Sequence, residues 1–178
     1  MGLIDTDWLQ SFSALHECAR RGELKGFDHA AYLRERGGLA HLLLEMLHVM
    51  LEPGQQPRRS LRAARALPID VELNDRTLLR SLRTIDLSAE GLAVLVPGDR
   101  VPRAGQEVRI ELGIPSGAPL RARARVMNVH PRESGARCGV LLLDLDARNM
   151  ERLETLIFDI VLEHLREEMG SRGSASLR

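Results

Sequence analysis

The chain has 178 residues, enough for one well-buried domain with a small extension, and its 25 basic and 25 acidic side chains leave no net charge. Hydrophobic residues make up 44% of the sequence and charged residues 28%, a balance that is typical of a globular protein and excludes disordered and fibrous classes. The neutral charge balance also argues against a protein that grips long nucleic acid, because such proteins usually carry excess positive charge.

The first third of the chain is predicted to be helical. Apolar residues recur at helical spacing over residues 8–23 and again over residues 29–52, with Asp28 as the expected N-cap of the second helix. The second half of this second helix is apolar on nearly every face, so it must be covered by the rest of the chain or by a second subunit. We therefore expect residues 1–56 to form a helical N-terminal extension and linker, which contacts a partner protein or a second copy of the chain in a homo-oligomer, most simply a dimer.

From residue 57 onward the sequence pattern changes. Short segments in which apolar and polar residues alternate are typical of half-buried antiparallel strands, and clusters of proline, glycine and serine separate these segments as turns. The expected strands are residues 69–74, 78–87, 92–96, 108–112, 122–126 and 138–145. Six short strands joined by adjacent connections predict a small antiparallel β-barrel.

A helix is predicted after the last strand. Asp146 is its expected N-cap, and apolar residues recur at helical spacing as far as Leu165, which predicts an amphipathic helix that docks on the barrel or plugs it. The barrel and this helix are assigned to residues 57–169, and residues 170–178 to a disordered tail. The expected fold class is an all-β core with added helices, α+β overall: a six-stranded antiparallel barrel, a C-terminal amphipathic helix and an N-terminal segment of two helices.

The expected location is the cytoplasm. Cys18 and Cys138 are too few and too far apart for a disulfide framework. Asp5 and Asp7 lie where a secretory signal would carry basic residues. The longest apolar stretch, residues 39–51, is shorter than the roughly 20 residues that a transmembrane helix needs, so no membrane insertion is expected.

Two short segments near the start of the predicted barrel carry the functional hypothesis. Arg58 and Arg62 lie four residues apart just before the first strand. An Asp-x-Ser-x-x-Gly segment follows at the corner between the second and third strands, formed by Asp86, Ser88 and Gly91. In this order and at these places, the two segments resemble the PilZ family of cyclic di-GMP receptors.

The resemblance covers roughly residues 57–165 and leaves the N-terminal helices outside. It implies a six-stranded barrel that binds cyclic di-GMP, a bacterial second messenger, and it implies that the arginine segment folds over ligand held against the barrel. This chain departs from the family in one respect: it is only 3% aromatic, and Asn128 and Leu142 stand in later strands where family members often carry aromatic residues.

The residue types also suit such a ligand for physical reasons. A guanidinium group can fork onto phosphate oxygens, stack on a purine, or meet guanine O6 and N7 with two hydrogen bonds, and Arg58 and Arg62 fit these tasks. The Asp86 carboxylate can accept hydrogen bonds from guanine N1 and N2. Ser88 can bind a phosphate or brace the turn, and Gly91 permits a backbone geometry that a Cβ atom forbids.

Other interpretations of the same residues remain open. Each motif alone is ordinary, because Asp-x-Ser-x-x-Gly is common turn chemistry and Arg-x-x-x-Arg occurs on solvated helix faces. Arg59 and Arg65 are auxiliary cations with less support than Arg58 and Arg62. No metal is expected at His41, Glu45 and His48, which share one helix face, because a fourth ligand and a recognisable motif are missing.

Neither a nucleic-acid partner nor an enzymatic activity is expected. Arg121, Arg123 and Arg125 alternate along one strand, but Glu107 and Glu111 on the neighbouring strand can neutralise them, so a nucleic-acid partner is not expected. The sequence contains no nucleophile elbow, phosphate-binding glycine loop or HExxH helix, so no enzyme is expected.

The leading hypothesis is therefore a cyclic di-GMP receptor without cofactor or chemistry of its own. It binds the dinucleotide between residues 58–62 and the corner at residues 86–91, and relays binding by a conformational change to a partner or a second subunit. The alternative is a protein-interaction adaptor that keeps the PilZ shape without responding to nucleotide.

Overall fold

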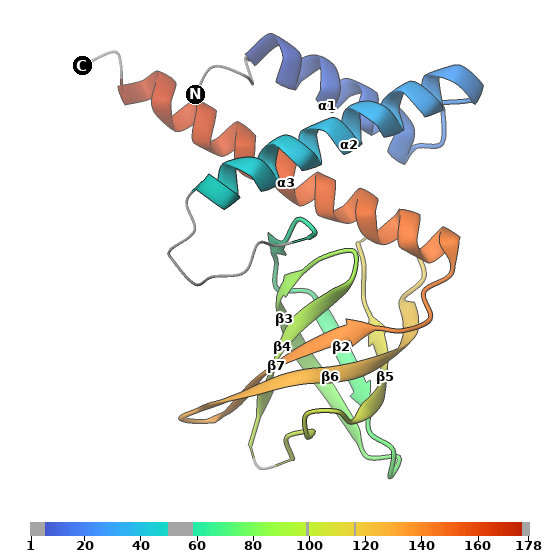
Figure 1. Ribbon diagram of the computed structural model, residues 1–178, viewed down its shortest axis with the longest axis vertical. Helices are drawn as coiled ribbons and strands as arrows, with labels where there is room; N and C mark the ends of the chain where they lie inside the picture. Colours follow the sequence, from blue (N-terminus) through green and yellow to red (C-terminus); the bar gives the residue numbers. More distant parts are fainter. Residues whose placement is uncertain (1–5, 50–58, 99, 116, 176–178) are drawn as a thin grey trace. The chain divides into compact units, whose positions relative to one another are not determined.

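The computed structural model describes residues 6–49, 59–98, 100–115 and 117–175 (Figure 1). The chain divides into two compact units. The barrel unit is Arg62–Ile157, and the helical unit combines Met1–Leu61 with Phe158–Arg178.

Within its described residues, the barrel unit contains seven strands whose pairings are all antiparallel. They are β1 (Ala63–Ala64), β2 (Pro68–Glu72), β3 (Leu78–Leu87), β4 (Gly91–Pro97), β5 (Glu107–Leu112), β6 (Leu120–Arg132) and β7 (Gly135–Leu142). Strands β2 to β7 close on themselves in the order β3-β2-β5-β6-β7-β4, because β4 also pairs with β3. The predicted six-stranded antiparallel barrel is confirmed, and β1 is one strand more than the sequence predicted.

Side-chain alternation along the strands makes the barrel core. On β6, Leu120, Ala122, Ala124 and Val126 are buried, whereas Arg121, Arg123 and Arg125 between them are exposed. The neighbouring β5 repeats this pattern over its six residues. Because successive side chains of a strand point to opposite faces, the period of two that was visible in the sequence separates the barrel core from its outer surface.

Three helices are present among the described residues: α1 (Thr6–Arg20), α2 (Gly26–Val49) and α3 (Ala147–Ala175). The predicted N-cap of α3 is confirmed, since the Asn149 N–H donates a hydrogen bond of 2.7 Å to Asp146 Oδ1. Asp28 instead lies in the first turn of α2, where a carboxylate suits the positive end of the helix. The backbone of α3 is helical as far as Ala175, which takes it through most of the segment predicted as a tail.

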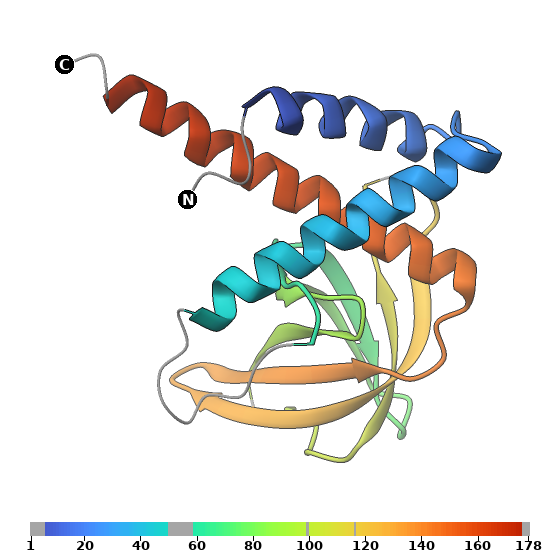
Figure 2. The same ribbon diagram turned by 45° about the horizontal axis from the view of Figure 1, so that its top comes forward.

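The helical unit has a small core of its own. In it, α1 and α2 form a helical hairpin (Figure 2). His16 is buried between the Tyr32 hydroxyl, 2.6 Å from its Nδ1, and Asp159 of α3, whose Oδ1 is 3.0 Å from its Nε2. The guanidinium of buried Arg36 lies over the rings of Tyr32 and Phe158. In the described part of the chain, no helix has both the length and the apolar content needed to cross a membrane.

Candidate functional site

The Asp-x-Ser-x-x-Gly segment forms the hairpin that joins β3 to β4. The Ser88 N–H donates to the Gly91 carbonyl at 2.7 Å, and the Gly91 N–H donates back to the Ser88 carbonyl at 3.3 Å. The buried Ser88 hydroxyl donates to the same Gly91 carbonyl at 3.1 Å. These bonds close a loop with Ala89 and Glu90 at its tip, so Ser88 braces the turn, one of the two roles that the sequence allowed.

Gly91 lies at a close approach of β4 and β7. It pairs with Leu141, and a Cβ atom added to Gly91 would stand 2.2 Å from the carbonyl oxygen of Val140. The hairpin is tied to the same strand end by a hydrogen bond of 2.9 Å from the Leu142 N–H to the Glu90 carbonyl. The requirement for glycine here therefore comes from strand packing.

The short strand β1 brings Arg62 to this corner. Ala63 and Ala64 pair with Leu87 and Asp86 on β3, which leaves Arg62 one residue beyond the pairing. The buried Thr84 hydroxyl fixes the chain that follows, because it accepts a hydrogen bond of 2.9 Å from the Leu67 N–H and donates one of 2.5 Å to the Arg65 carbonyl. As a result, Arg62 Nη1 lies 3.6 Å from Asp86 Oδ1, close enough for an ion pair.

A second arginine shares the same carboxylate. Arg137 on β7 donates a hydrogen bond of 2.9 Å from its Nη2 to Asp86 Oδ2. The Asp86 side chain is 18% exposed, against 47% for Arg62 and 32% for Arg137. One largely covered carboxylate thus holds two guanidinium groups that keep access to solvent.

Arg62 and Arg137 line a hollow of about 170 Å³ on the barrel unit, which we call the motif groove. Arg62, Ser88 and Gly91 from the predicted motifs line it, and so do Asn128, His130 and Arg137. The last three were not predicted as site residues. Their places depend on β7 pairing with β4 on one side and with β6 on the other, and the order of residues along the chain does not reveal the pairing of β7 with β4.

The predicted site residues are thus partly brought together. Arg62, Asp86, Ser88 and Gly91 meet at one corner of the barrel. Arg58 lies outside the described residues. Arg59 is exposed and belongs to the helical unit.

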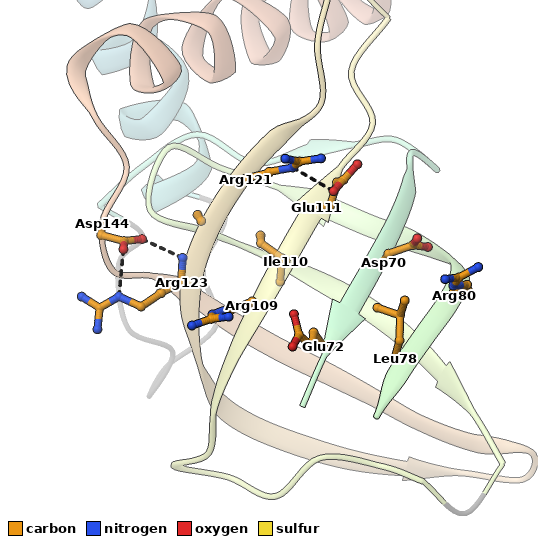
Figure 3. A pocket seen from close by; sticks show the side chains of 11 residues that line it. Asp70, Glu72, Leu78, Arg80, Arg109, Ile110, Glu111, Arg121, Arg123 and Asp144 are labelled. Atoms are coloured by element: carbon orange, nitrogen blue, oxygen red, sulfur yellow. Dashed lines mark hydrogen bonds and ion pairs between the residues drawn. The ribbon is translucent and has the colours of Figure 1, made fainter. Parts of the chain in front are cut away.

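A second hollow, of about 620 Å³, lies on the barrel unit and is lined mainly by charged side chains of β2, β3, β5 and β6 (Figure 3). We call it the charged hollow. Its arginines and acids balance in number: Arg80, Arg109, Arg121 and Arg123 face Asp70, Glu72, Glu111 and Asp144.

Ion pairs neutralise the basic face of β6, as the sequence predicted. Arg121 lies 2.9 Å from Glu111, and Arg125 lies 2.8 Å from Glu107 on the neighbouring strand. The hydrogen bond from Arg125 lowers the pKa of Glu107 below its ordinary value. Arg123 bonds Asp144 at 2.8 Å, and this side-chain hydrogen bond lowers the pKa of Asp144 in the same way. These charges are largely occupied with one another.

On the face of α2 that carries His41 and Glu45, these two side chains form an ion pair. His41 Nε2 lies 3.1 Å from Glu45 Oε1, and the side chain of His48 falls outside the described residues. Among the side chains that the structure describes, no three histidine, cysteine or acidic groups gather in a way that could hold a metal ion.

Comparison with known proteins identifies the barrel. The sequence profile described as the PilZ domain matches residues 56–159. No curated protein sequence matches the chain.

Several solved structures share the fold. The PilZ domain of Escherichia coli YcgR with c-di-GMP is 20% identical, with a TM-score of 0.51, and the match covers 69% of this chain and 100% of that one. The MrkH complex with c-di-GMP from K. pneumonia is 18% identical, with a TM-score of 0.55 and coverage of 64% and 56%. The Bacillus subtilis inhibitor of motility, MotI, is 17% identical, with a TM-score of 0.54 and coverage of 61% and 53%. The matched region therefore spans little more than half the length of the MotI and MrkH chains.

Proposed function

Because the chain belongs to the PilZ domain family, we propose that it is a receptor for cyclic di-GMP and that the motif groove receives the dinucleotide. The supporting observation is that Arg62 and the separate segment of Asp86, Ser88 and Gly91 meet at one corner of the barrel. Two similar structures, those of YcgR and MrkH, hold cyclic di-GMP. No catalytic step belongs to this proposal.

The chemistry of the corner suits an anion that carries guanines. A guanidinium group has five N–H donors, and Arg62 has only one ion-pair contact with Asp86, at 3.6 Å. Its other donors can fork onto a phosphate or onto the O6 and N7 atoms of guanine. A carboxylate offers about four lone-pair sites, so Asp86 can hold both arginines and still accept from guanine N1 or N2.

The size of the motif groove indicates that other residues complete the site. Its volume of about 170 Å³ is below the roughly 300–1,000 Å³ of ordinary small-molecule pockets. The groove alone therefore takes only part of a molecule with two bases and two phosphates. In the proposed receptor, Arg58 and Arg59 supply further cations and close over the part of the ligand that the groove leaves uncovered.

The proposed relay runs through the N-terminal helices. Large apolar side chains are exposed on α2, with Phe27 at 78%, Met46 at 39% and Leu47 at 40% exposure. We propose that a second copy of the chain or a partner protein covers this helix and that cyclic di-GMP changes the surface it meets. The proposed location is the cytoplasm, which agrees with Cys18 and Cys138 both being free.

Isothermal titration calorimetry of the full chain with cyclic di-GMP tests this function. The wild-type protein is expected to give a saturable heat, and Arg62→Ala is expected to weaken binding about 10- to 100-fold, since a charge-assisted contact contributes about 1.5–3 kcal/mol. The matched control is Arg121→Ala, which removes an exposed arginine from the charged hollow and should bind as the wild type does.

A wild-type chain that gives no heat would contradict the receptor function and favour the nucleotide-independent adaptor.

Light scattering after size exclusion, with and without cyclic di-GMP, tests the relay. A ligand-dependent change in mass supports a subunit interface on the helices.

A further inference from the structure

Arg137 is a cation of the motif groove that neither sequence motif contains. Its register places it opposite Leu95 on β4 and His130 on β6. Its side chain points outward, because Ala136 and Cys138 on either side of it are buried. Arg137 therefore lies on the outer face of the barrel, between Leu95 and His130, and forms part of the wall of the groove.

Two positions near Arg137, on β7 and β4, carry little or no side chain. The next outward position on β7 is Gly139, which pairs with Ala93 on β4 and Asn128 on β6. A Cβ atom on Gly139 would stand 2.6 Å from Asn128 Oδ1, so the amide occupies the space that a side chain would fill. Gly139 and Ala93 are therefore small positions in the lining of the groove, and the Asn128 amide covers Gly139.

The charge of the groove depends on Arg137. Around the groove, Arg62 and Arg137 stand against two carboxylates, Asp86 and Glu90. Without Arg137 the other three residues would have a net negative charge, which disfavours a ligand with two phosphates. A cation at this position is thus needed for anion binding as well as for pairing Asp86.

The bond to Asp86 fixes the orientation of Arg137 and leaves most of its donors unused. Only Nη2 contacts the carboxylate, at 2.9 Å, and the side chain remains 32% exposed. A planar guanidinium held by one corner presents a second edge with parallel donors. This edge matches the paired O6 and N7 acceptors of guanine, whereas adenine carries an amino donor in place of O6.

We propose that Arg137 is a third ligand-binding cation and that it reads the O6 and N7 edge of a guanine bound in the motif groove, with Asp86 as its positioning residue. The inference rests on the proposed function, and it assigns to Arg137 the preference for guanine over adenine. In this assignment Arg62 binds a phosphate of the ligand.

Titration calorimetry of the full chain with cyclic di-GMP and with cyclic di-AMP tests this inference. Arg137→Ala is expected to weaken cyclic di-GMP binding about 10- to 100-fold and to bring its Kd close to that of cyclic di-AMP. Arg137→Lys keeps the charge without the planar fork, so it should lose the guanine preference as well. Arg125→Ala is the matched control on the neighbouring strand, and it should keep both the affinity and the preference.

Two results would overturn the inference while the receptor function stands: a guanine preference that survives in Arg137→Ala, or full recovery of that preference by Arg137→Lys. A loss of affinity equal for both dinucleotides would show that Arg137 only supports the fold or the overall charge, and would overturn it too. If the wild-type chain binds no cyclic di-GMP, the receptor proposal fails separately. In that case the NMR signal of Arg137 Nε–H tests the inference about guanine. A shift of this signal with guanosine monophosphate but not with adenosine monophosphate supports guanine recognition by Arg137, and the absence of a shift overturns it.

Discussion

The two hollows of the barrel unit are built in opposite ways. The charged hollow is about 620 Å³ in volume, and its walls are long side chains that largely neutralise one another, as Arg121 and Glu111 do at 2.9 Å. The motif groove is about 170 Å³, and its lining includes positions with little or no side chain, such as Gly139 and Ala93. By volume alone the charged hollow would be the better binding site. The arrangement of charges favours the motif groove instead.

The difference lies in how the arginines share carboxylates. In the charged hollow, Arg121 has a carboxylate of its own, Glu111, and such an exposed pair contributes little free energy. In the motif groove one carboxylate, Asp86, is shared by Arg62 and Arg137, so each guanidinium keeps unused donors. A binding site for an anion needs cations that are oriented but not fully occupied, and sharing a carboxylate provides this.

The largest expected effect comes from filling the close approach beneath the groove. In Gly91→Ala the new methyl group would stand 2.2 Å from the Val140 carbonyl oxygen, so β4 and β7 must separate. We expect the free energy of unfolding to fall by about 1–3 kcal/mol, as for other overpacked sites. Cyclic di-GMP binding should fall with it, because the same strands form the groove. Urea unfolding followed by circular dichroism, together with calorimetry, measures both effects.

Two controls separate this effect from substitution in general. Arg121→Ala in the charged hollow should change the free energy of unfolding by no more than about 0.5 kcal/mol, because the side chain is 77% exposed. Gly38→Ala in α2, where an added methyl meets nothing within 4 Å, should be neutral or stabilising by about 0.5–1 kcal/mol. A Gly91→Ala protein as stable as these controls would show that the close approach of β4 and β7 does not limit the groove.

The sequence predicted the parts of the groove that are local along the chain. Asp86, Ser88 and Gly91 are neighbours in one hairpin, and their residue types are those that close a tight turn. The alternation of buried and exposed residues likewise predicted the barrel strands, because the period of two is a local property of a strand. Both predictions depend on interactions over only a few residues.

The sequence did not predict what long-range pairing creates. The strand β1 contains only Ala63 and Ala64, too short for an alternation pattern, and it exists because it pairs with the end of β3. Arg137 resembles any outward arginine until β7 pairs with β4 and brings it to Asp86. One available clue was the small residue Gly139, two positions further along β7, which marks a place where another group approaches the strand closely.

A smaller effect is expected from the carboxylate that opposes ligand charge in the motif groove. Glu90 lines the groove and is exposed, so Glu90→Gln removes a negative charge near the bound phosphates while keeping the side-chain shape. We expect cyclic di-GMP binding to strengthen about two- to fivefold, because a unit charge at close range in water contributes up to about 1 kcal/mol. Calorimetry at low and high salt measures this, and the gain should shrink as salt screens the charge.

The charged hollow supplies the control for Glu90. Glu72→Gln removes the same charge from a wall of that hollow and should leave cyclic di-GMP affinity unchanged. If Glu90→Gln weakens binding instead, then Glu90 accepts a hydrogen bond from the ligand, and its negative charge assists binding. If both variants strengthen binding equally, the effect comes from overall charge, and the two hollows do not differ in the way that their side chains suggest.

The smallest expected effect concerns the ion pairs of the charged hollow. The hydrogen bond from Arg123, at 2.8 Å, holds the pKa of Asp144 below its ordinary value. A group whose pKa is lowered by folding contributes stability that is present above its unfolded pKa, near 4, and lost as the pH falls through the folded value. Arg123→Ala should therefore lower the melting temperature at pH 7, and this difference from the wild type should narrow below about pH 4. The control is Arg103→Ala, which removes an exposed arginine outside both hollows and should show no change of its melting-temperature difference with pH. If the melting-temperature difference of Arg123→Ala also stays constant with pH, then Arg123 does not stabilise the ionised form of Asp144.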